Sequence, residues 1–131
     1  MEVGNRKSAI ENRTMTPEQL KERMKQFALR VIRLVDALPK GKGAEVIGGQ
    51  LLRSATSVAA NYRAACRARS RAEFVAKLGV VEEEADESAF WLELLMESGI
   101  MPETRLADLM QEASELTAII VASRKTARHQ S

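Results

Sequence analysis

The chain has 131 residues, of which 45% are hydrophobic, 29% are charged and only 4% are aromatic, and its formal net charge is +2. This length fits one domain with its own core. The few aromatic residues and the few turn residues, three prolines and seven glycines, argue against a β-sandwich or barrel. The single cysteine, Cys66, excludes an internal disulfide and is typical of a protein of the reducing cytoplasm. The first 14 residues lack the apolar core of a signal peptide, and no apolar stretch is long enough to span a membrane.

The N-terminal part predicts a polar arm followed by a helix. Residues 1–15 mix charged and small polar residues without a period, and we interpret them as a flexible arm. Thr16 can cap a helix, Pro17 suits its first position and Gln19 completes a capping box. Apolar residues then recur with a 3.6-residue period as far as Leu38, which predicts an amphipathic helix that ends in the following Pro- and Gly-containing loop.

A second helix is predicted to begin near Ala44 or Glu45 and to reach Cys66. Gly48 and Gly49 lie in its first turns, where each costs about 1 kcal/mol relative to Ala. They indicate either close packing at this point or a later helix start. The small residues of the stretch 54–60 would let a neighbouring helix approach closely.

The third helix is predicted from Arg71, after a capping box formed by Ser70 and Glu73, to about Gly99. Its apolar residues follow a heptad-like seam. A second apolar patch lies off that seam, and we interpret its members Phe90 and Trp91 as part of an oligomer interface, the alternative being a wide monomer core.

The fourth helix is predicted to begin at Pro102 and to end in a basic segment that contains Arg124, Lys125 and Arg128. Four amphipathic helices with short connections predict an all-α, antiparallel up-down-up-down four-helix bundle. We assign residues 16–125 to this bundle and residues 126–131 to a frayed C-terminal tail.

No enzyme site is evident in the sequence. Metal-binding bundles of the ferritin type use Glu-x-x-His motifs, but the only histidine, His129, lies in the tail. Cys66 has no histidine partner outside that tail, so we interpret it as a packed or interfacial thiol and not as a nucleophile. The glycines lack the strand and the Lys-Ser/Thr sequence of a phosphate-binding loop. We therefore predict a protein without catalytic residues, metal or cofactor.

Charge changes sign between the second and third helices. From residue 40 to residue 71, only Glu45 opposes seven basic residues, so the segment carries +6; these are Lys40, Lys42, Arg53, Arg63, Arg67, Arg69 and Arg71. From residue 73 to residue 97, eight acidic residues oppose Lys77, so this segment carries −7.

Two interpretations of this charge pattern stay open. A basic surface at a helix end can bind nucleic-acid phosphates. Alternatively, the two segments neutralise each other within a subunit or between subunits. Arg53 lies near the apolar stripe, and we expect it to form a structural ion pair with an inward glutamate of the third helix. Few aromatic residues accompany the arginines, which argues against the stacking mode of single-strand binding.

The stretch from Gln50 to Leu95 resembles the bacterial "four helix bundle protein" family. The resemblance rests on the order and spacing of three segments: RSATSVAAN at residues 53–61, R-x-x-S-x-x-E-F at residues 67–74 and WLELL at residues 91–95. That family includes proteins encoded by intervening sequences within large-subunit ribosomal RNA genes, and the accessory variability determinant of diversity-generating retroelements. The resemblance covers roughly Pro17 to Ala127.

The resemblance implies an antiparallel four-helix bundle that assembles as a homopentamer. For the retroelement members it also implies a positively charged surface that binds nucleic acid and a reverse transcriptase partner. Our leading hypothesis is a non-enzymatic, cytoplasmic homo-oligomer that binds RNA or DNA through Arg63, Arg67, Arg69 and Arg71, with Lys40 and Lys42. The alternative is a protein-interaction scaffold, without a nucleic-acid role, whose basic and acidic segments form ion pairs between subunits.

Overall fold

The computed structural model describes residues 15–130. Within this range the chain forms four α-helices and no strand: α2 (Pro17–Asp36), α3 (Lys42–Ala65), α4 (Arg71–Glu97) and α5 (Glu103–His129). The predicted all-α fold class with four helices is therefore confirmed. Apart from Met15, which is partly buried against the core, the predicted N-terminal arm lies outside the described residues.

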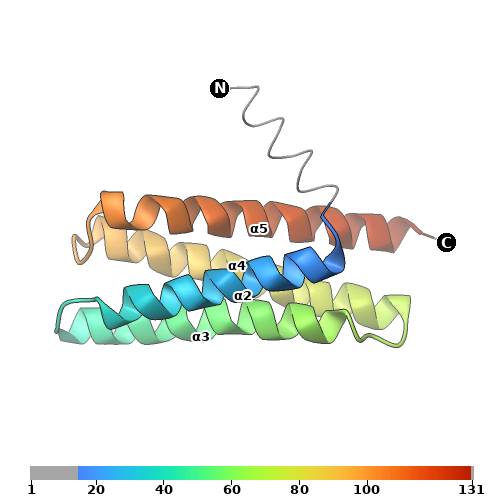
Figure 1. Cartoon of the computed structure of the whole chain (residues 1–131), viewed down its shortest axis with the longest axis horizontal. Coiled ribbons are helices and arrows are strands. Elements are labelled where there is room, and N and C mark those ends of the chain that lie inside the picture. The colour runs from blue at the N-terminus through green and yellow to red at the C-terminus, as the bar shows by residue number, and fades with distance from the viewer. Residues whose placement is uncertain (1–14, 131) are drawn as a thin grey trace, which may run out of the picture.

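The helices lie side by side along their length (Figure 1). The α2–α3 and α4–α5 connections lie at one end of the molecule and the α3–α4 connection at the other, so consecutive helices run in opposite directions (Figure 1). Helix α4 packs extensively against both α3 and α5, and α2 packs against α3, whereas the contact between α2 and α5 is thin. Each end of the molecule therefore brings together chain segments that are distant in the sequence (Figure 1).

Local capping signals account for the starts of α2 and α4, whereas the first residues of α3 and α5 have no side-chain cap. The Thr16 hydroxyl accepts a hydrogen bond from the Gln19 amide, and the Gln19 side chain accepts one from the Thr16 amide, which completes the predicted capping box. Ser70 caps α4 by accepting a hydrogen bond from the Glu73 amide at 3.0 Å. The start of α3, at Lys42, is two to three residues earlier than the predicted start at Ala44 or Glu45.

The end of α5 differs most from the prediction. The helix continues to His129, four residues beyond Lys125, in the segment that we expected to fray. Ala127 in the additional turn is only 5% exposed, so this turn buries apolar surface against the bundle. The prediction of a frayed tail from residue 126 is therefore wrong for the residues as far as His129.

The core draws on all four helices, and its largest fully buried side chains include Met24, Phe27, Leu51, Leu78, Leu92 and Leu116. Val46, an apolar residue in the first turns of α3, is 58% exposed and lies outside this core. Two small polar residues, Ser54 and Ser88, are fully buried between α3 and α4, with their hydroxyl oxygens 3.0 Å apart. Their small size lets these two helices approach closely, as the small residues of α3 predicted.

Candidate nucleic-acid interface

The arginine run occupies the end of the molecule at the α3–α4 connection. Arg63 lies in the last turn of α3, Arg67 and Arg69 lie in the connection, and Arg71 begins α4. All four side chains are exposed. The turn between two antiparallel helices therefore brings these arginines to one end of the bundle, where a ligand can reach them.

The acidic residues of α4 form no direct ion pair with this run in the described structure. In residues 15–130, no carboxylate lies within 4.0 Å of a side-chain nitrogen of Arg63, Arg67 or Arg69. The glutamates of α4 that do form ion pairs bind other arginines, Arg53 and Arg124.

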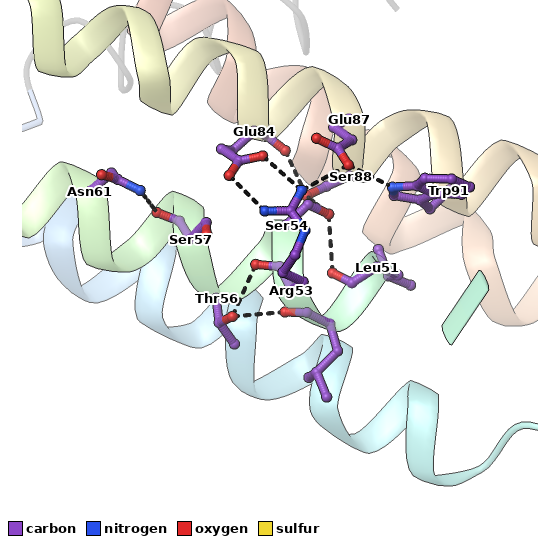
Figure 2. A network of polar contacts seen from close by, with 11 residues as sticks. Leu51, Arg53, Ser54, Thr56, Ser57, Asn61, Glu84, Glu87, Ser88 and Trp91 are labelled. Atoms are coloured by element: carbon purple, nitrogen blue, oxygen red, sulfur yellow. Dashed lines mark hydrogen bonds and ion pairs between the residues drawn. The ribbon is translucent and has the colours of Figure 1, made fainter. Parts of the chain in front are cut away.

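Arg53 is the centre of a polar network between α3 and α4 (Figure 2). Its guanidinium donates to both carboxylate oxygens of Glu84, at 3.1 and 3.2 Å, and to Glu87 at 2.8 Å. The indole of Trp91 also donates to Glu87, at 3.2 Å. The hydrogen bond from Arg53, followed by that from Trp91, holds the pKa of Glu87 below its usual value. Arg53 therefore joins two helices, and its donors already point to partners in its own chain.

Arg124 of α5 also contacts α4. The Arg124 guanidinium lies 3.5 Å from the Glu82 carboxylate. It also packs on Gly79, because a Cβ atom added at residue 79 would lie only 3.1 Å from the guanidinium. The Arg124 Nε is buried without a hydrogen-bond partner in the described part of the chain. Gly79 thus lets an arginine of α5 pack directly on the backbone of α4.

Lys40 and Lys42 lie at the α2–α3 connection, at the opposite end of the bundle from the arginine run (Figure 1). At 1.5 Å per residue, α3 separates Lys42 from Arg63 by roughly 30 Å. The basic segment of residues 40–71 is therefore divided between two ends of the molecule, and the two lysines do not adjoin the arginines.

The C-terminal end of α5 does lie beside the arginine run. The Arg71 guanidinium donates a hydrogen bond to the backbone carbonyl of Gln130, 59 residues further along the chain. Lys125 and Arg128, in the last turns of α5, are exposed. In the sequence, these two residues indicate only a helix C-terminus. The predicted antiparallel order of the third and fourth helices is the signal that places the end of α5 beside the start of α4.

Phe90 and Trp91, the predicted interface residues, lie together on α4. Their ring centroids are 5.0 Å apart with an interplanar angle of 65°, an edge-to-face contact. Phe90 is 48% exposed, whereas Trp91 is half-buried and packs against the core. Phe90 is therefore a large aromatic side chain of α4 that is exposed to solvent.

Comparison with known proteins identifies the family. Residues 18–122 match the model of the 23S rRNA-intervening sequence protein family. The chain belongs to this family. A protein of unknown function from the S23 ribosomal protein family of Bacteroides thetaiotaomicron VPI-5482, with a 1.70 Å crystal structure, is 32% identical. The two structures superpose with a TM-score of 0.78, over 85% of this chain and 99% of the other. No functionally curated protein matched the chain.

The match to the 23S rRNA-intervening sequence protein family confirms the resemblance predicted from the sequence. It includes the whole arginine run, but it ends at residue 122 and so does not reach Lys125 or Arg128. Among the residues that the structure describes, no group of three or more His, Cys, Asp or Glu side chains is placed to hold a metal ion. No described helix combines the length and hydrophobicity required to cross a membrane.

Proposed function

We propose that this 23S rRNA-intervening sequence protein is a non-enzymatic accessory factor that binds RNA or DNA through Arg63, Arg67, Arg69 and Arg71. The observation that carries the proposal is the gathering of four exposed arginines at one end, none of them with a carboxylate within 4.0 Å in residues 15–130. Unneutralised positive charge attracts nucleic-acid phosphates. The family's association with 23S rRNA supports an RNA-related role.

We further propose that the bundle, in its up-down-up-down order, is the protomer of a homopentamer that acts in the cytoplasm. The 48% exposed Phe90, in contact with Trp91, supports an apolar subunit interface on α4. A reverse transcriptase is an additional proposed partner if the chain is encoded within a retroelement.

A mobility-shift titration of the full chain tests nucleic-acid binding, with an RNA hairpin and a DNA duplex as probes over a range of salt concentrations. Simultaneous Arg63→Ala, Arg67→Ala and Arg69→Ala substitution is expected to lower the affinity. It is also expected to reduce the slope of log K against log salt by about 3, roughly one for each lost phosphate contact. Lys40→Ala with Lys42→Ala, at the opposite end, is the control and is expected to retain binding. No shift of either probe at low salt would contradict the proposal.

The alternative scaffold function is favoured by a separate observation on α4. Glu83, Asp86 and Glu93 are exposed, and no basic side chain lies within 4.0 Å of them in the described residues. In this alternative they pair with the arginine run of a neighbouring subunit. The same triple arginine variant then loses oligomer mass in light scattering, while the wild-type chain shifts neither nucleic-acid probe.

A further inference from the structure

We propose that Lys125 and Arg128 of α5 belong to the same phosphate-binding surface as the arginine run, and that this composite surface binds the backbone of a base-paired nucleic acid. The inference rests on the proposed nucleic-acid function. It adds residues beyond the range of the family match and specifies the form of the ligand. RNA and DNA duplexes share the phosphodiester chemistry that such a surface recognises.

The register of α4 and α5 places these residues together. Arg71, the first residue of α4, contacts the carbonyl of Gln130, and Arg124 packs over Gly79 two turns further along α4. Arg128 follows Arg124 by one helical turn, so both lie on the same face of α5. That face meets α4, so Arg128 lies beside the first turns of α4, next to the arginine run.

The resulting end of the molecule is strongly positive. Without Arg124, which pairs with Glu82, residues 63–77 and 125–129 contain seven Lys and Arg residues and one carboxylate, that of Glu73. The first turns of α2 also lie at this end (Figure 1), and their glutamates are neutralised locally: Glu18 pairs with Lys21 at 2.7 Å, and Glu22 with Lys25 at 3.1 Å. Because these two glutamates pair with lysines of their own helix, they do not form ion pairs with the basic residues of α5 or of the arginine run.

The aromatic residues indicate which form of nucleic acid fits. Tyr62 is 5% exposed, and Phe74 is partly buried against the core, so neither offers a ring face to an unpaired base. Phe90 lies 19 residues beyond Arg71, roughly 28 Å along α4. Binding of single strands relies on aromatic stacking platforms, whereas a duplex presents its phosphates outward and keeps its bases stacked inside. A basic surface without an exposed Phe, Tyr or Trp ring matches the duplex.

Fluorescence anisotropy of the full-length protein tests the inference with three labelled probes: an RNA duplex, a DNA duplex of the same sequence, and one of the single strands. The double variant Lys125→Gln and Arg128→Gln is compared with Lys40→Gln and Lys42→Gln, which removes equal charge from the opposite end. The α5 variant is expected to lower the salt slope on the duplex by about 2, and the control to leave it unchanged. Arg128→Lys, which keeps the charge, is expected to retain the wild-type slope. The two duplex arms show whether RNA or DNA is preferred.

Equal slopes for the α5 variant and its control would overturn the composite surface. If the triple arginine variant still lost affinity, the proposed function itself would stand. Tighter binding of the single strand than of either duplex would overturn the assignment to base-paired ligands. No binding of any probe by the wild-type chain would overturn the proposed function and this inference together. Thermal unfolding followed by circular dichroism verifies that the exposed-site variants remain folded.

Discussion

Gly48 and Gly49 are neighbours in α3 but have different surroundings. A Cβ at Gly48 would lie 2.9 Å from the Leu38 Cδ1 atom, whereas a Cβ at Gly49 meets nothing within 4 Å. The close-packing interpretation of these glycines therefore holds for Gly48 only, and the alternative of a later helix start is wrong because α3 begins at Lys42.

Gly49→Ala is expected to raise the free energy of unfolding by about 0.5–1 kcal/mol, because alanine removes the backbone entropy cost of an exposed helical glycine. Gly48→Ala gains the same helical preference but must displace Leu38. We therefore expect it to be less stable than Gly49→Ala in urea denaturation. Equal stabilisation by the two substitutions would contradict the close contact between Gly48 and Leu38.

At the scale of elements, the thin contact between α2 and α5 makes one ion-pair network important. Arg23 of α2 donates to both carboxylate oxygens of Glu112, at 2.7 Å each, and to Glu115 at 2.8 Å. Its side chain is 20% exposed and that of Glu112 15%. The Glu112 carboxylate, the main cause, raises the pKa of Arg23, which keeps the guanidinium charged.

Arg23→Met is expected to lower the free energy of unfolding by about 1–3 kcal/mol, because it leaves the largely buried Glu112 without its guanidinium partner. Amide hydrogen exchange is expected to accelerate in α2 more than in α3. Lys21→Met is the matched control, since it removes an exposed pair with Glu18 and should change stability by less than about 0.5 kcal/mol. Equal effects of the two substitutions would contradict a special role for the α2–α5 network.

The helices were predictable because their signals are local. The Thr16 capping box, the Ser70 cap and the apolar periodicity each depend on residues within a few turns. Local signals of this kind do not predict which residues lie together at each end of the bundle. Lys40 is close to the arginine run in sequence but far from it in space, whereas Gln130 is distant in sequence and contacts Arg71. Helix length and antiparallel order decide these distances.

At the scale of the whole molecule, the exposed aromatic residue of α4 bears on assembly. Phe90→Asp is expected to reduce the mass measured by light scattering from the proposed five times 14.5 kDa towards that of one chain, because a charge in an apolar interface is costly to bury. Val121→Asp on α5 is the control, because Val121 is exposed to a similar extent, 43%. An unchanged mass for Phe90→Asp would place the subunit interface elsewhere.

The gathering of basic residues at the α3–α4 end also affects the stability of the free protein. Like charges held together repel one another, and dissolved salt weakens this repulsion. The last turn of α5 stays in place through the buried Ala127 and the hydrogen bond from Arg71 to Gln130. A polyanion that binds only the folded end both removes the repulsion and favours the ordered turn, so its binding and the folding of α5 are thermodynamically linked. The end of the molecule that is best suited to hold a nucleic acid is thus also the end that a nucleic acid would stabilise most.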